Sequence, residues 1–72
     1  METIEALDTL IVQFILASGT TTFLTFDYEG DEKFAAFCGP MEAAEFRTRN
    51  EAHEAVALAK FQGLKFQRYT VF

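Results

Sequence analysis

The chain has 72 residues, half of them hydrophobic and nine of them phenylalanine, which is too apolar a composition for a disordered protein. We expect a single domain over residues 1–72, which buries only ~60% of the surface exposed on unfolding and is therefore only modestly stable. The formal net charge of −5 argues against direct nucleic-acid binding, because phosphate contacts need clustered lysines and arginines.

The cysteine count and the hydropathy pattern bear on the cellular compartment. One cysteine cannot form an internal disulfide, and an unpaired thiol fits a reducing environment. The apolar stretch over residues 10–17 is shorter than the ~18 residues that a membrane span requires. The first residues, METIE, are acidic where a secretory signal is basic. We therefore expect a cytoplasmic protein without a membrane partner.

Residues 2–18 fit two secondary structures. The run LIVQFILA is rich in β-branched residues and phenylalanine, as a buried strand is, and ASGTTT reads as a hairpin loop. We prefer a strand at about 9–17 paired with one at about 21–28, after a short helical or frayed start at residues 2–7. The alternative is an N-terminal amphipathic helix, because the apolar residues also share one helical face: Ile4, Leu7, Leu10, Ile11, Phe14 and Ile15.

The middle of the chain predicts a second hairpin. In the strand-like TTFLTFDYE, the residues Leu24, Phe26 and Tyr28 alternate, and the polar EGDE that follows predicts a turn. KFAAFC then predicts a short strand, in which Cys38 alternates with Phe34 and is expected to be a small buried residue. GPMEAAEF reads as a turn into another strand or as one helical turn after the proline.

A helix is predicted over about residues 49–62. Thr48-Arg-Asn-Glu51 matches the capping box, in which the Thr48 hydroxyl accepts the Glu51 N–H and the Glu51 carboxylate reaches back to the Thr48 N–H. Gly63 suits the left-handed conformation that ends helices.

The predicted helix has a face of small residues and a separate apolar pair. The small face lets the helix approach a sheet closely, and Leu58 and Phe61 point away from it, on the side of Glu54. Either Phe61 folds over the helix end or the core face rotates towards Leu58; otherwise the pair belongs to an exposed interface. The small face consists of Ala52, Ala55, Val56 and Ala59.

The C-terminal LKFQRYTVF predicts a strand whose alternation changes phase. Leu64 and Phe66 share one face, whereas Tyr69 and Val71 share the other. Either a bulge near Gln67-Arg68 resets the register or both faces are covered. Because the last residues carry few charges, this strand could pair at a sheet edge with a partner or with a second copy.

No group of residues predicts catalysis, a cofactor or a metal site, so we expect a protein that is not an enzyme. The acidic sequence DYEGDE begins at Asp27 and has its glycine, Gly30, at the fourth position. A calcium-binding loop needs glycine at its sixth position, so a solvated turn is expected instead. Cys38 and His53 lack the sequence context of a thiolate–imidazole pair. The acidic residues of the turn are Asp27, Glu29, Asp31 and Glu32.

The order of elements resembles many small proteins encoded by bacteriophages and mobile elements, which share a hairpin, an F-x-T-x-x-E-A helix start and a last strand. Residues 44–72 are also similar to the T7-type phage inhibitor of host RNA polymerase, which has a strand–helix–strand core. Such proteins bind and block a host protein, and the resemblance transfers no site residues. The residues that carry it are Leu24, Thr25, Ala44, Phe46, Thr48, Glu51 and Ala52.

Together these patterns predict an α+β fold in which one helix packs on one face of a small antiparallel sheet of three to four strands. The expected function is a non-enzymatic, acidic, phage-type protein that binds and inhibits or retargets a host protein in the bacterial cytoplasm. One alternative is nucleic-acid mimicry through the acidic turn, as in anti-restriction or anti-CRISPR proteins; another is a homodimer built through the last strand. The residues expected to bind the partner are Leu58, Phe61, Tyr69 and Phe72.

Overall fold

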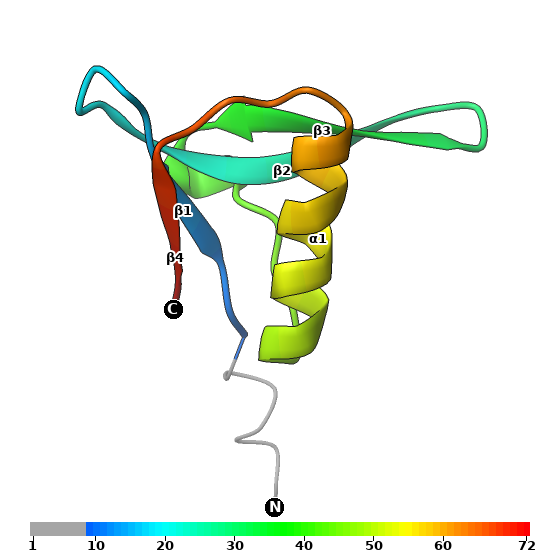
Figure 1. Cartoon of the computed structure of the whole chain (residues 1–72). Coiled ribbons are helices and arrows are strands. Elements are labelled where there is room, and N and C mark those ends of the chain that lie inside the picture. Colours follow the sequence, from blue (N-terminus) through cyan, green and yellow to red (C-terminus); the bar gives the residue numbers. More distant parts are fainter. Residues whose placement is uncertain (1–8) are drawn as a thin grey trace, which may run out of the picture.

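The computed structural model describes residues 9–72, which form a four-stranded antiparallel sheet with one α-helix on one face (Figure 1). The strand order is β3-β2-β1-β4, so the last strand lies beside the first. This arrangement confirms the predicted α+β fold. The elements are β1 (Val12–Ile15), β2 (Thr21–Glu29), β3 (Glu32–Cys38), the 3₁₀-helix η2 (Pro40–Glu42), α1 (Arg49–Phe61) and β4 (Arg68–Val71).

The first hairpin confirms the strand interpretation of the N-terminal region. In β1, Phe14 pairs with Thr22 of β2, and the connecting turn places Gly19 at a φ of 92°, a conformation that glycine adopts without strain. The alternative prediction, an N-terminal amphipathic helix, is therefore wrong for residues 9–18. The predicted helical or frayed start at residues 2–7 lies outside the described part of the chain.

The second hairpin extends beyond the core as an arm (Figure 1). Glu29 and Glu32 are register partners across a two-residue turn, in which Gly30 has a φ of 63°. The alternating residues of β2 become progressively more accessible towards the tip: Leu24 is buried, Phe26 is half-buried and Tyr28 is 69% exposed. We call residues 27–33 the hairpin arm.

One face of the sheet packs against α1, and within residues 9–72 the other face, called here the helix-free face, carries no α-helix. In β3, Ala35 and Phe37 lie on the helix side, where the rings of Phe37 and Phe14 meet edge to face with centroids 5.4 Å apart. Phe34 and Cys38 therefore lie on the opposite face, where Phe34 is 40% exposed and Cys38 is half-buried. Cys38, predicted to be a small buried residue, is therefore only partly buried. The buried core consists of Val12, Phe14, Leu24, Ala35, Ala52, Ala55, Val56, Ala59 and Val71.

The ends of α1 follow the predicted signals with one change. The Glu51 N–H donates to the Thr48 hydroxyl at 3.1 Å, as the capping box requires, but the Glu51 carboxylate accepts the N–H of Arg47 instead of that of Thr48. The carboxylate thus reaches one residue further back along the chain. The helix ends at Phe61, and Gly63 follows with a φ of 100°.

Gln62, the residue after α1, connects the helix to β3, which is one edge strand of the sheet. The Ala35 N–H donates to Gln62 Oε1 at 2.7 Å, and Gln62 Nε2 donates to the carbonyl of Lys33 at 2.9 Å. The side-chain amide thereby supplies the donor and acceptor that a further strand would offer to β3. This contact fixes the C-terminal end of α1 beside the base of the hairpin arm.

A bulge explains the phase change in the last strand. The Gln67 N–H donates to the Ile15 carbonyl at 2.8 Å, while Arg68 is the register partner of the same Ile15. Two residues of the last strand therefore oppose one residue of β1, which defines a β-bulge. The bulge turns Tyr69 and Val71 towards the helix side and confirms the first of the two predicted alternatives.

Candidate functional site

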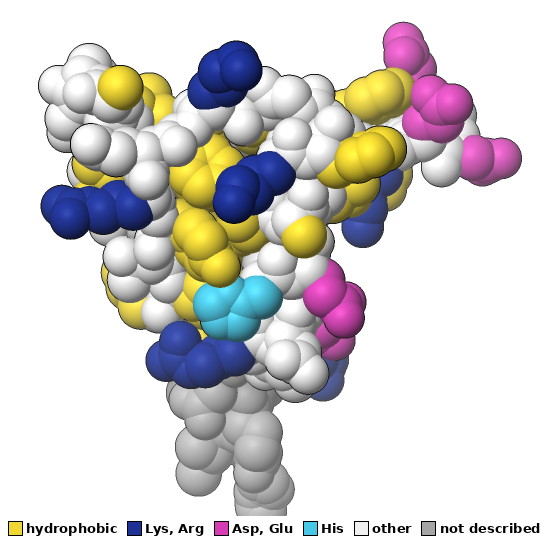
Figure 2. All heavy atoms as spheres, in the orientation of Figure 1, with side chains coloured by type: hydrophobic (Ala, Val, Ile, Leu, Met, Phe, Trp, Pro, Cys, Tyr) yellow, Lys and Arg dark blue, Asp and Glu magenta, His cyan; other side chains and the backbone are white. Residues whose placement is uncertain are grey.

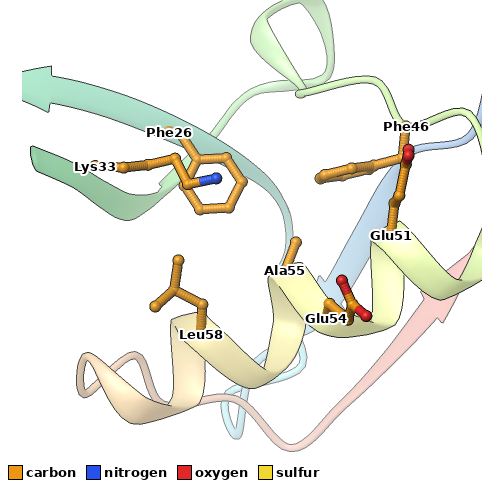
Figure 3. Close-up of a pocket in the computed structure, with 7 residues that line it drawn as sticks. All are labelled: Phe26, Lys33, Phe46, Glu51, Glu54, Ala55 and Leu58. Carbon is orange, nitrogen blue, oxygen red and sulfur yellow. The ribbon is translucent and has the colours of Figure 1, made fainter. Parts of the chain in front are cut away.

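A groove lies between α1 and the β2–β3 hairpin, with a volume of about 390 Å³ (Figure 3). Its floor is aromatic and aliphatic, and its rim carries both acidic and basic side chains. The residues that line it are Phe26, Lys33, Phe46, Glu51, Glu54, Ala55 and Leu58.

Three separate parts of the fold bring the apolar lining together. Ala55 and Leu58 project from the flank of α1 that faces the hairpin, and Phe26 projects from β2. Phe46 is placed by a bridge to Leu10, in which the Phe46 N–H donates to the Leu10 carbonyl at 2.8 Å and the Leu10 N–H donates back at 2.8 Å. The rings of Phe26 and Phe46 then meet edge to face with centroids 6.4 Å apart.

The groove is electrostatically asymmetric. Lys33 reaches in from the hairpin, and its Nζ lies 4.6 Å from the centre of the Phe26 ring, within cation–π distance. The opposite rim carries Glu51, whose Oε1 accepts the Arg47 N–H, and the exposed Glu54. The site thus combines a cation over an aromatic ring with carboxylates on the helix side.

Two of the four residues expected to bind a partner lie on one flank of α1. Leu58 is half-buried where it lines the groove, and the buried face of α1 is the predicted small-residue face, so the core face is not rotated towards Leu58. Phe61 is 86% exposed, which contradicts the alternative in which this ring closes over the helix end. Glu54, Leu58 and Phe61 follow each other at helical spacing, and they form a continuous stripe beside the groove.

The other two residues lie elsewhere. The Tyr69 hydroxyl is 2.9 Å from His53 Nδ1, and its ring stands edge to face against Phe66, so Tyr69 packs under the opposite flank of the helix. Phe72 is 54% exposed, and its backbone exchanges two hydrogen bonds with Ile11 at the far end of β1. The predicted set therefore does not form one surface.

The acidic turn is the tip of the hairpin arm. Figure 2 shows acidic side chains at this tip and hydrophobic side chains between it and the helix. Within residues 9–72, no group of three or more histidine, cysteine or acidic side chains is arranged to hold a metal ion. All four predicted acidic residues are exposed: Asp27, Glu29, Asp31 and Glu32.

Cys38 and His53 do not form a catalytic pair. Cys38 lies on the helix-free face of the sheet, whereas His53 lies on α1 and contacts Tyr69. Burial, together with the negative charges of Glu42 and Asp27, raises the pKa of the Cys38 thiol. The thiol therefore stays protonated at neutral pH, which is unfavourable for a nucleophile.

Comparison of the chain with protein-family models, with curated proteins and with solved structures gives no match in any of the three. No helix in the described part of the chain is long and apolar enough to cross a membrane.

Of the residues that line the groove, only Leu58 was predicted from the sequence to bind a partner, and Phe26, Lys33 and Phe46 were not predicted as parts of a site. Phe26 and Phe46 have the pattern of core residues, and no local signal distinguishes a phenylalanine that lines a groove from one that is buried. The contact of Lys33 with Phe26 follows from the two-residue turn, which places Phe26 opposite Ala35 and Lys33 opposite Tyr28.

Proposed function

We propose that this protein is a non-enzymatic binding protein whose partner is a protein with a basic surface. The observation that carries the proposal is the groove beside Leu58. Glu51 and Glu54 make the helix side of its rim acidic, and the acidic tip of the hairpin arm lies beyond it. In its specific form, the proposal is a phage-type protein that acts in the bacterial cytoplasm and inhibits or retargets a host protein. That form rests on the resemblance of the helix start and on the single cysteine.

The exposed aromatic residues support a protein partner. Tyr28 on the arm and Phe61 on α1 are 69% and 86% exposed, and tyrosine is among the residues that most often dominate binding energy at interfaces. The carboxylates of the arm would speed association with a basic surface and select against acidic ones. The same arm offers no cluster of positive charge to nucleic acid.

Capture from a bacterial lysate tests this proposal with matched charge variants. We expect the wild-type protein to retain a basic protein, and the Asp31→Asn/Glu32→Gln variant to lose most of it, because the arm loses two exposed charges. Rising salt should release the captured protein, since exposed charges are screened. The retained proteins are identified and quantified by mass spectrometry.

The control is the Glu42→Gln/Glu45→Gln variant, which removes the same number of charges outside the hairpin arm. Both of these residues are exposed, so the substitutions should leave the fold intact, as circular dichroism would verify. Equal loss of binding in both variants would mean that only the net charge matters, and the hairpin arm would then not be the binding surface.

A second candidate is mimicry of nucleic acid by the arm. It is favoured by one observation: Asp27 and Glu29 alternate on one strand and so share a face, and Glu32 lies directly opposite Glu29. A mimic would bind a nucleic-acid-binding protein in competition with DNA. If DNA does not displace the captured protein, mimicry is excluded.

A homodimer through β4 would use the edge of the sheet opposite β3. Because Phe72 and Ile11 exchange both hydrogen bonds, Tyr69 and Val71 direct their backbone groups away from β1. The Val71 carbonyl already accepts a hydrogen bond from Arg49 Nη1 at 3.1 Å, which shortens the edge available to a second copy. Gel filtration at high concentration decides this point, since a strict monomer excludes the dimer.

A further inference from the structure

We infer that the groove between α1 and the hairpin binds an arginine side chain of the protein partner. The inference rests on the proposed binding function and adds the chemistry by which the partner is recognised. It is carried by three features of the groove: an aromatic ring that already faces a cation, an aliphatic wall and an exposed carboxylate at the rim.

The aromatic floor accepts a positive charge. Lys33 Nζ lies 4.6 Å from the centre of the Phe26 ring, so the protein's own side chain already places an ammonium group there. Arginine stacks on aromatic faces more readily than lysine, because its guanidinium is planar and less strongly hydrated. The Phe46 ring, 6.4 Å from Phe26 between centroids, extends the same floor.

The helix wall suits the rest of an arginine side chain. Ala55 and Leu58 present aliphatic surface along which the methylene stem can lie while its charged end stays near water. Glu54 is exposed at the rim and projects from the same wall (Figure 3), so its carboxylate can accept hydrogen bonds from the guanidinium. Glu51 adds negative charge next to it, although one of its oxygens accepts the Arg47 N–H.

The size of the groove limits what can enter. Its volume of about 390 Å³ is near the lower end of the ~300–1,000 Å³ that is usual for small-molecule sites. One long side chain with its adjoining backbone fits this space, whereas a whole helix does not. Lys33 would have to leave the Phe26 ring for the incoming guanidinium, and it therefore acts as an internal competitor.

Nuclear magnetic resonance titration tests the inference with two peptides of equal shape, acetyl-Ala-Arg-Ala-amide and acetyl-Ala-citrulline-Ala-amide. Citrulline has the shape of arginine without its charge. We expect the arginine peptide to shift the methyl signals of Leu58 saturably and the citrulline peptide to bind at least about 3-fold more weakly, because the cation–π and carboxylate contacts are lost.

Two pairs of variants test the individual contacts. Glu54→Gln should weaken binding of the arginine peptide by about 2–5-fold, whereas Glu45→Gln, with the same change in net charge, should leave the affinity unchanged. Lys33→Met should strengthen binding, because it removes the internal competitor, whereas Lys65→Met outside the groove should have little effect. All four residues are exposed, so the variants should fold normally.

Equal affinity for the two peptides, or saturable shifts confined to residues outside the groove, would overturn the inference. So would equal effects of Glu54→Gln and Glu45→Gln. Each of these outcomes leaves the proposed binding function intact if the lysate capture still depends on the hairpin arm. Conversely, if the lysate capture fails and the arginine peptide still binds in the titration, the proposed function is wrong and the inferred chemistry of the groove still holds.

Discussion

The Phe14→Ala variant should be largely unfolded. Phe14 is fully buried, and its ring lies 4.4 Å from that of Phe66 and 5.4 Å from that of Phe37, measured between centroids. Removing a buried phenylalanine ring costs about 3–5 kcal/mol, from lost transfer energy and the cavity that remains. At ~0.05–0.15 kcal/mol per residue, a domain of this length has about 4–11 kcal/mol in total, so one substitution removes much of its stability.

Phe61→Ala is the matched control, because the same atoms are removed from a side chain that is 86% exposed. We expect a change within about 0.5 kcal/mol, as for most surface substitutions. Urea denaturation followed by circular dichroism measures both free energies of unfolding. A Phe61→Ala variant as unstable as Phe14→Ala would show that Phe61 contributes to the core and is not free for a partner.

The second large effect is expected for Ala59→Leu. Ala59 is fully buried on the face of α1 that meets the sheet, next to Val56. Adding a branched side chain there forces the helix away from the sheet, and overpacking of this kind costs about 1–3 kcal/mol. At ~4–8 °C per kcal/mol, the midpoint of thermal unfolding should fall by about 4–24 °C.

Ala57→Leu separates packing from helix propensity. Ala57 lies on the same helix but is exposed, and leucine and alanine are both strong helix formers. The midpoint of Ala57→Leu should therefore stay close to that of the wild type. If the two leucine variants had the same midpoint, the close approach of the small-residue face to the sheet would be contradicted.

The features that the sequence predicted correctly are those set by neighbouring residues. Thr48 and Gly63 mark the helix ends because a hydroxyl cap and a left-handed glycine act within one turn. The bulge at Gln67 was one of two alternatives, because a phase change in alternation has only a few structural causes. The helix ends are set by local contacts, whereas the bulge is formed by the contact of Gln67 with the distant Ile15, and only its phase change is visible in the local sequence.

Features that depend on contacts between distant elements could not be predicted. KFAAFC is apolar on both faces, so alternation alone cannot say that Ala35 faces the helix and Phe34 does not. Tyr28 continues the alternation of the core face, yet it is exposed because the hairpin extends past the end of the sheet core. The groove requires Phe26, Phe46 and Leu58 to meet, and only the tertiary arrangement brings them together.

Photo-crosslinking tests the central claim, that a protein partner binds the flank of α1 that carries Leu58 and Phe61, beside the hairpin arm. A photoreactive phenylalanine analogue replaces Phe61 in one protein and Thr70 in another, because Thr70 is exposed on the helix-free face of the sheet. After irradiation in a bacterial lysate, the account predicts a defined adduct from position 61 that diminishes at high salt, and none from position 70. An adduct from position 70 alone, or equal adducts from both positions, would contradict it.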